Sequence, residues 1–302
     1  MEPGGERGGE VVQRESAMSH APDTVDLRHF TGFLLRQAFV RAVGAERACM
    51  PADGHVAEVT VLSVLAERGA VSQRELSDIT SVNQTVIVRH VDALESKGWV
   101  RRDSNPADRR SYALQLTETG QAALLELSGD LDQAEAELTQ ALTRDEARRL
   151  KRRLRELLAD DEAIRMRSLA DRTGFLVARA HSTVREEAER RLGPLGIHPR
   201  DFGVLAVVGR EQPCSQTQVA ARLGVTSPAV IGFVDGLVAE GLLQRSRSGT
   251  DRRTNDLVLT SAGQRCLVAA VAAATEIQAE LVRRLGAEGE AELRMLLGKL
   301  IG

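Results

Sequence analysis

The sequence is poor in aromatic residues and cysteines and contains no long apolar run, and each scarcity excludes a class of protein. Aromatic side chains make up 3% of the 302 residues, so aliphatic Leu, Val and Ala must fill the core. Cys49, Cys214 and Cys266 are odd in number and widely spaced, which fits neither a disulfide framework nor a metal site. No stretch reaches the ~20 apolar residues of a membrane helix, and no signal peptide is recognisable. We therefore expect a cytoplasmic protein that binds no membrane.

The charge balance and the motif content narrow the function further. A formal net charge of −3 excludes a general basic coat for nucleic acid, so any such binding must be local. The chain has no Gly-rich phosphate loop, no metal-ligand spacing and no nucleophile motif. We therefore predict that it is not an enzyme and that it needs no cofactor and no metal.

One sequence motif occurs twice. Residues 108–121 read DRRSYALQLTETGQ, and residues 251–264 read DRRTNDLVLTSAGQ, 143 positions later. Between 72–124 and 215–267 the alignment has no gap and 17 of 53 positions are identical. A match of this length indicates an internal duplication, with each copy a folding unit.

The length of the chain also suits two domains of about 150 residues. Upstream of the first match, TGFLL at 31–35 corresponds to TGFLV at 173–177, at an offset of 142. The sequence therefore predicts a disordered N-terminal tail at 1–24, a first domain at 25–160 and a second domain at 161–302.

Both copies carry the same order of predicted elements. Apolar periodicity, Ser and Thr caps and terminal glycines predict five helices and two short strands in each copy. Thr143 and Glu146 have the spacing of a capping box for a further helix. In the first copy the five helices are expected at about 25–47, at about 56–68, from Ser72, from near Asn83 to Gly98 and from Thr117. In the second copy they are expected at about 165–192, at about 199–210, from Ser215, from near Thr226 to Gly241 and from Thr260. The strands are expected in WVRRD and SYALQLT of the first copy and in LLQRS and TNDLVLT of the second.

Helix, tight turn, helix and a basic two-stranded hairpin form the winged helix-turn-helix, a DNA-binding fold. The residue pattern also resembles the MarR family (multiple antibiotic resistance regulators), over roughly 27–158 and 168–302. The positions that carry this resemblance are Asp92 and Asp235, Leu94 and Leu237, Gly98 and Gly241, Asp108-Arg109-Arg110 and Asp251-Arg252-Arg253, and the Leu-x-Leu-Thr-x-x-Gly that follows each triplet.

The resemblance implies a fold that is mainly α with small β-wings. Members of the family are usually homodimers, whose long first and last helices intertwine and hold two reading heads about 34 Å apart, one turn of DNA. Here both heads are on one chain, so we expect a monomeric pseudo-dimer with a helical dimerisation-like core formed by 20–45, 125–190 and 265–302. A homodimer of the whole chain remains the alternative.

Double-stranded DNA is the expected partner. Residues at the start of each fourth helix would reach base edges in the major groove, and arginines of the hairpins would bind phosphates or a narrow minor groove. The alternative for the hairpin arginines is a solvated tip. The expected DNA-binding residues are Asn83, Gln84, Thr85, Arg89, Arg101, Arg102, Arg109 and Arg110 in the first copy, and Thr226, Ser227, Arg245, Arg247, Arg252 and Arg253 in the second.

The second head is expected to bind DNA more weakly. Its recognition segment, 225–241, contains no Lys or Arg, and Gly232 replaces Arg89. The first head therefore favours a transcriptional regulator, most simply a ligand-responsive repressor. The second favours an alternative, a protein of the same fold that binds or sequesters a small molecule and has lost DNA binding.

Relatives that resemble this chain often release DNA when a small aromatic or phenolic molecule enters a cleft beside the reading head. Each residue that could line such a cleft could instead be an ordinary residue of the core or of a helix end. Cys49 beside Arg47 is a further candidate, as a sensor thiol, although a structural role fits all three cysteines better. By position, the residues expected to line the cleft are Phe33, Gln37 and His55, together with Phe175, Arg179, His198 and Phe202.

Overall fold

The computed structural model describes residues 25–50, 56–80, 82–104, 112–247 and 255–302. The predicted tail at 1–24 lies outside them. The two copies predicted from the sequence are called the first and second repeat below. Both are mainly helical and carry small antiparallel sheets, which confirms the predicted fold class.

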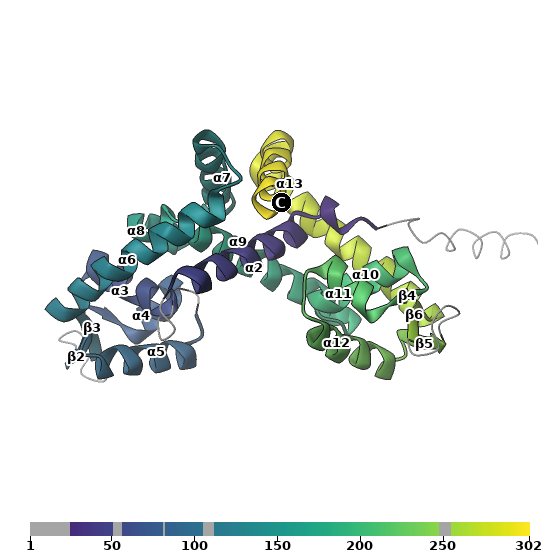
Figure 1. Cartoon of the computed structure of the whole chain (residues 1–302), viewed down its shortest axis with the longest axis horizontal. Helices are drawn as coiled ribbons and strands as arrows, with labels where there is room; N and C mark the ends of the chain where they lie inside the picture. The colour runs from purple at the N-terminus through teal and green to yellow at the C-terminus, as the bar shows by residue number, and fades with distance from the viewer. Residues whose placement is uncertain (1–24, 51–55, 81, 105–111, 248–254) are drawn as a thin grey trace, which may run out of the picture. The chain divides into compact units, whose positions relative to one another are not determined.

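The first repeat follows the predicted order of elements, with one short strand added (Figure 1). Its elements are η1 (Leu27–His29), α2 (Thr31–Cys49), α3 (Val56–Arg68), β1 (Val71–Ser72), α4 (Gln73–Thr80), α5 (Gln84–Ser96), β2 (Val100–Ser104), β3 (Tyr112–Leu116), α6 (Glu118–Thr139) and α7 (Arg144–Leu157).

The second repeat has the same order of main elements, with a short helix α8 and a 3₁₀ turn η3 added, and its last two helices are both contained in α13, on either side of a kink. The helix α13 bends at Gly286, where φ is 71° and ψ is 159°. In the alignment of the repeats Gly286 corresponds to Thr143, the N-cap of α7, so the bend stands where the first repeat changes from α6 to α7. The elements are η2 (Glu162–Arg165), α8 (Arg167–Ala170), α9 (Thr173–Leu192), η3 (Gly193–Leu195), α10 (Pro199–Glu211), β4 (Cys214–Ser215), α11 (Gln216–Leu223), α12 (Ser227–Ala239), β5 (Leu243–Arg247), β6 (Asn255–Leu259) and α13 (Ser261–Ile301).

Each wing is a three-stranded antiparallel sheet, in the order β1-β3-β2 or β4-β6-β5. In the first wing Arg102 lies opposite Leu114, and in the second Arg245 lies opposite Leu257. The short strands β1 and β4 were not predicted, because two residues cannot display the alternation by which a strand is recognised. They pair with the apolar end of the hairpin and tie it to the helix-turn-helix.

The long first helices begin later than the sequence predicts, at Thr31 and Thr173 and not near 25 and 165. Ahead of α2, Leu27–His29 form a 3₁₀ turn and Phe30 is extended, with φ −97° and ψ 116°. Ahead of α9, Met166 is extended as well. Apolar periodicity continues through both turns, so it could not locate the true starts.

The predicted helix caps are confirmed. The backbone N–H of Ser72 donates to Glu75 Oε2 at 2.7 Å, and the N–H of Glu75 donates to Ser72 Oγ at 3.2 Å. Thr143 and Glu146 make the same reciprocal pair, at 3.0 and 3.2 Å. Each box satisfies amides that the first turn of a helix would leave without partners.

The Thr-x-x-Gly that ends each repeated motif is explained by a close approach of two backbone segments. Thr117 caps α6, and a Cβ on Gly120 would lie 2.0 Å from the carbonyl oxygen of Trp99. A Cβ on Gly263 would lie at the same distance from the carbonyl oxygen of Leu242. No side chain fits there, so the wing can pack directly on the start of α6 or α13 only where glycine occupies this position.

Contacts divide the chain into two compact units that do not follow the repeats. One unit ends at Phe30 and resumes over Arg185–Ile277, and it contains the helix-turn-helix and wing of the second repeat. The other joins Thr31–Val184 to Gln278–Gly302, so it holds the first head with long helices from both repeats. A domain boundary at residue 160 stays a prediction.

Within the larger unit, the repeats bind each other's first helices by the same contact. Glu135 on α6 accepts hydrogen bonds from the N–H of Thr173, at 2.8 Å, and from its hydroxyl, at 2.5 Å. Gln278 on α13, which corresponds to Glu135 in the alignment of the repeats, accepts one from the N–H of Thr31 at 3.0 Å. Each repeat thus satisfies the first amide of the other repeat's long helix.

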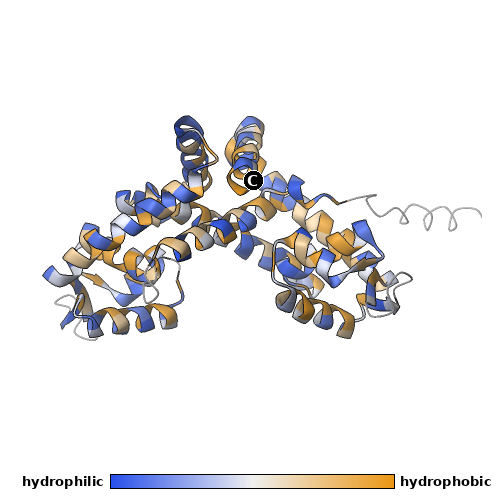
Figure 2. Ribbon diagram, in the orientation of Figure 1, coloured by the Kyte–Doolittle hydropathy of each residue, from blue (hydrophilic) through white to orange (hydrophobic). Residues whose placement is uncertain are grey.

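The helix α7 has a charged surface, and Figure 2 colours it almost entirely blue. Its buried stripe is Leu150, Leu154 and Leu157, at helical spacing. Leu293 and Leu296, on the last part of α13, are fully buried in the same unit. Burial of each such leucine contributes about 1.5–3 kcal/mol.

Candidate DNA interface and ligand cavity

The first recognition helix, α5, is fixed by its apolar side and by its cap. Ile87, Val91 and Leu94 are buried in the core of the first head. The side chain of Asn83 accepts a hydrogen bond from the N–H of Thr85 at 2.9 Å and starts the helix. This anchoring leaves the opposite side of the helix exposed.

The residues expected to read bases lie on that exposed side. Asn83, Gln84, Thr85 and Arg89 are all exposed. Arg89 makes no hydrogen bond or ion pair with any residue that the structure describes, so its guanidinium is available to a ligand. Asn83 uses one acceptor for the helix cap, which leaves its amide N–H₂ for a base or a phosphate.

The two described arginines of the first wing have partners within the protein. Arg102 pairs with Asp92 and Glu95 of α5, and these carboxylates raise the pKa of its guanidinium against the effect of desolvation, which lowers it. Arg101 donates to Gln115 Oε1 at 2.6 Å and lies 3.1 Å from Asp103. Arg102 is therefore better placed to hold the wing against the recognition helix than to bind phosphate.

The second head repeats this link. Arg245 pairs with Asp235 of α12, at the positions that correspond to Arg102 and Asp92. Both repeats keep the arginine and the aspartate, although their recognition helices differ elsewhere. This retention is the signal by which the sequence could have shown a structural pair.

Several expected residues cannot be placed. Arg109 and Arg110, Arg252 and Arg253, and His55 lie outside the described residues. The backbone of Arg247 ends β5, where it pairs with Asn255.

The second recognition helix, α12, is exposed but apolar. Thr226 and Ser227 are exposed at its start, as expected. Ile231 is 46% exposed beside Gly232, and Arg200 of α10 lies over the ring of Phe233, 5.3 Å from its centre. Arg200 was not predicted as a site residue, because it lies outside the repeated motifs. It supplies a cation to a helix that has none of its own.

The helices α11 and α12 meet at 114°, within the range of helix-turn-helix motifs. They are also the one pair of described helices with enough combined length and apolar character for a broken membrane span. No single helix in the described ranges is long and apolar enough to cross a membrane.

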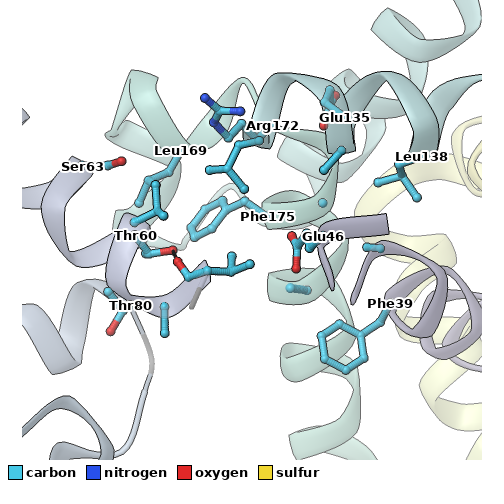
Figure 3. Close-up of a pocket in the computed structure, with 18 of the residues that line it drawn as sticks. Phe39, Glu46, Thr60, Ser63, Thr80, Glu135, Leu138, Leu169, Arg172 and Phe175 are labelled. Carbon is cyan, nitrogen blue, oxygen red and sulfur yellow. Dashed lines mark hydrogen bonds between the residues drawn. The ribbon is translucent and has the colours of Figure 1, made fainter. Parts of the chain in front are cut away.

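A cavity of about 400 Å³ lies in the larger unit, between α2, α3, α6 and the start of α9 (Figure 3). Its wall is mostly apolar, and its volume is in the range of small-molecule sites. Six polar or charged side chains stand among the apolar ones: Glu46, Thr60, Ser63, Thr80, Glu135 and Arg172.

The charged groups of the cavity differ in their partners. Arg172 pairs with Asp132 at 3.1 Å, and Glu135 holds Thr173. Glu46 is half-buried and has no hydrogen-bond or ion-pair partner among the described residues. Burial, with a smaller effect from the Glu135 carboxylate, raises the pKa of Glu46 to about 7.

Comparison with known proteins places the chain in a family. The HTH-type transcriptional repressor NicR of Pseudomonas putida is 34% identical over 118 residues, which are 37% of this chain and 74% of NicR. The multiple antibiotic resistance protein MarR of Escherichia coli is 36% identical over 113 residues, which are 36% of this chain and 76% of MarR. The chain belongs to the MarR family. Family profiles match it twice, at 56–112 and 195–254, which confirms the tandem arrangement.

Among solved structures, this MarR-family chain is similar to the transcriptional repressor CouR bound to a 23-mer DNA duplex. The two are 29% identical, the match covers 44% of this chain and 94% of CouR, and the TM-score is 0.42.

Of the residues expected to line a ligand cleft, Phe175 lines the cavity of this MarR-family chain. It comes from the second repeat and faces the first head. Phe33 and Gln37 lie on α2 but not in the wall of this cavity. Glu46, which lies on the same helix, was not predicted, because no local pattern distinguishes it from a surface glutamate.

The other cleft candidates have different roles. Arg179 is buried and donates to Asp161 at 2.9 Å. Phe202 is buried and meets Phe30 edge to face, with ring centres 6.0 Å apart. The N–H of His198 donates to Asp201 at the start of α10. These contacts are the kind that the alternative interpretation expects, and a role of the three residues in a ligand cleft stays a prediction.

For Cys49 the structure favours a structural role over a sensor thiol. Desolvation and a hydrogen bond to Glu137, at 3.5 Å, raise the pKa of this thiol, whereas an activated thiolate requires a lowered pKa. Cys214 is buried, and its burial raises its pKa to about 11. In the part of the chain that the structure describes, no group of His, Cys, Asp and Glu side chains is arranged to hold a metal ion.

Proposed function

We propose that this chain is a cytoplasmic, ligand-responsive transcriptional repressor without enzymatic activity, which binds duplex DNA through two unlike winged heads. The observation that carries the proposal is the exposed face of α5, where Gln84, Thr85 and Arg89 stand together. These side chains match the donors and acceptors of base edges in the major groove, and Arg89 has no competing partner in the described chain.

The heads contribute unequally. The first head reads bases through α5, and its wing residues Arg109 and Arg110 bind the backbone. The second head holds the DNA backbone through Thr226, Ser227 and its wing arginines, while α12 lacks the side chains for base reading. The operator is therefore asymmetric, with one half-site better defined than the other.

The chain acts as a monomeric pseudo-dimer. The reciprocal contacts of Glu135 with Thr173 and of Gln278 with Thr31 support this proposal, because they are the exchange of helices that two subunits of a symmetric dimer would make. Sedimentation at micromolar concentration should give the mass of one chain, with one duplex bound per chain.

Ligand response rests on the cavity beside α5. Ile87 of α5 lines the cavity, and so do Thr80 and Val82, which precede the helix. A small aromatic molecule that enters between α2, α6 and this turn would displace the recognition helix. The relative NicR is named as a transcriptional repressor, which supports the same role here.

A mobility shift on the DNA upstream of the protein's own gene tests the proposal. Wild type should retard the duplex, and each loss of a phosphate contact should flatten the salt dependence by about one unit of slope. With Arg109→Ala and Arg110→Ala together, retardation should fall clearly. If wild type retards no duplex even at low salt, the alternative of a small-molecule-binding protein with eroded heads replaces this proposal.

A further inference from the structure

The cavity beside the first head carries a carboxylate that nothing in the described protein neutralises. Glu46 projects from α2, and a Cβ on Gly174 would lie 3.1 Å from its Oε1, so the carboxylate rests against bare backbone. From the elements packed around it, the charged groups of the wall are Glu135 of α6 and Arg172 ahead of α9. Arg172 is paired with Asp132, and Glu135 is paired with Lys151 of α7 at 4.0 Å and accepts from Thr173. Among the described residues, Glu46 is therefore the charged group of the wall that has no counter-charge.

Aromatic rings stand beside this carboxylate. In the view of Figure 3, Glu46 lies between the rings of Phe175 and Phe39. Phe39 is itself fixed, because it stacks on His181 with ring centres 4.8 Å apart and planes at 16°. A cavity lined by an unpaired carboxylate and two aromatic rings favours an organic cation, since both the charge and the ring quadrupoles attract it.

We infer that the effector of the first head is a compact organic cation with an apolar group, such as an arylalkyl ammonium ion, held by Glu46 between Phe39 and Phe175. This inference rests on the proposed function and narrows the chemical class of its ligand. The apolar part of the molecule fills the aliphatic wall, and the cationic head replaces the water that a half-buried carboxylate would otherwise need.

An anionic effector fits this cavity poorly. A phenolate or carboxylate would lie near Glu46 and Glu135, and like charges in a partly desolvated site repel each other strongly. The raised pKa of Glu46 agrees with this surrounding, because it shows that negative charge is already disfavoured there. A bound cation would favour the ionised form and lower that pKa again.

The acidic site belongs to the first repeat alone. At the offset of 142 that relates α2 to α9, Ala188 takes the place of Glu46, and at the offset of 143 Gln278 takes the place of Glu135. The second repeat thus has neither carboxylate at these positions, and the next residue of α9, Glu189, is exposed and pairs with Arg185. A cationic effector would therefore bind one head of the pair, next to the recognition helix that carries Arg89.

Calorimetry on the full chain without DNA tests the site with two probes of the same shape. Benzyltrimethylammonium carries a permanent positive charge, and neopentylbenzene is its neutral isostere. At pH 8.5 we expect the cation to bind at least ten-fold more tightly than the isostere. Between pH 8.5 and pH 5.5 its affinity should fall about ten-fold as Glu46 becomes protonated.

Glu46→Gln should abolish both the preference for the cation and its pH dependence. Glu126→Gln, which removes an exposed carboxylate of α6 outside the cavity wall, should leave both effects intact.

The outcomes separate this inference from the proposed function. Equal binding of the two probes, tighter binding of salicylate than of the cation, or an unchanged preference in Glu46→Gln overturns the inference, whether or not the protein binds DNA. Release of the upstream duplex by the cation, lost in Glu46→Gln, supports it as the effector class. If the cation binds through Glu46 but leaves a retarded duplex in place, its role as effector is overturned. Absence of any DNA retardation overturns the proposed function, and the calorimetric result still decides the chemistry of the cavity.

Discussion

Arg149 and Glu292 occupy the same position in the two repeats and form an ion pair with Nη1 and Oε1 at 3.0 Å. In a symmetric dimer of identical chains, a position that meets its own copy must present the same side chain from both sides. Opposite charges are possible here because the two copies are on one chain and have diverged. Arg153 completes the pair, with its Nε 2.6 Å from Glu292 Oε2.

The first prediction concerns this pair. Glu292→Gln should lower the free energy of unfolding by about 1–2 kcal/mol, because three arginines lose their shared carboxylate. Urea unfolding of Glu292→Gln, Arg149→Met and the double variant should give a coupling energy above about 0.5 kcal/mol.

Arg153, with smaller contributions from Arg149 and Arg152, lowers the pKa of Glu292. The stabilisation is therefore present above about pH 4.5 and lost as the pH falls below it. Glu288→Gln, exposed on the same helix, is the control. Strictly additive variants would show that the pair contributes nothing.

Gly120 provides a test of the motif that defines the repeats. Gly120→Ala should destabilise the protein by about 3 kcal/mol or more, because its Cβ would overlap the carbonyl of Trp99 and the wing would have to move. Gly129→Ala on the same helix meets nothing within 4 Å and should be neutral or stabilising by up to about 1 kcal/mol. Thermal unfolding of both variants measures the contrast. Similar melting temperatures for the two would refute the close-approach argument.

The unequal heads lead to a reciprocal pair of variants. Arg89→Ala should weaken DNA binding by about ten-fold, the loss of roughly 1.4 kcal/mol, and relax the base preference in one half-site. Gly232→Arg places a cation at the matching position of α12, where a Cβ meets nothing within 4 Å. It should tighten binding and steepen the salt dependence by about one unit of slope. Fluorescence anisotropy at several salt concentrations measures both. An unchanged salt slope in Gly232→Arg would mean that α12 does not face DNA.

Glu46 should make stability depend on pH in the direction opposite to Glu292. Its pKa rises on folding from 4.5 to about 7, so the folded state holds a proton that the unfolded state releases. The favourable contribution is complete below pH 4.5 and is lost as the pH rises through 7. Glu46→Gln should therefore be more stable than wild type by about 1–2 kcal/mol at pH 8.5, and by much less at pH 5. Thermal melts at the two pH values measure this difference, and an equal effect at both would exclude a perturbed Glu46.

Sequence predicted the features that short-range patterns encode. The caps at Asn83, Thr117 and Thr143 and the end of each recognition helix near Gly98 and Gly241 follow from local residue patterns, and the duplication follows from aligning the chain with itself; the structure confirms them. The starts of α2 and α9 were placed too early, because apolar periodicity runs on through the preceding turns. What fixes those starts is a contact with a helix from the other repeat, far away in the chain.

The candidate sites divide in the same way. Arg89 could be found by aligning the repeats, because its environment is the surface of one helix. Arg102 and Arg245 were assigned to DNA from their place in a basic hairpin, and only the fold brings Asp92 and Asp235 beside them. The acidic cavity is the extreme case, since Glu46, Glu135 and Phe175 come from distant segments in two repeats. No pattern within either repeat could assemble it.

In a symmetric dimer every substitution occurs in both subunits, so a change that stabilises one contact between the subunits must also be tolerated at the equivalent contact. The reciprocal caps of this chain are free of that constraint: Glu135 serves at one contact and Gln278 at the other. The carboxylate that caps Thr173 also lines the cavity, whereas Thr31 is held by the uncharged Gln278 together with the buried Glu290, which accepts from the Thr31 hydroxyl at 2.5 Å. A single mutation can therefore change one of these two helix contacts without changing the other. In this way one head can evolve a ligand site while the other head retains its DNA contacts.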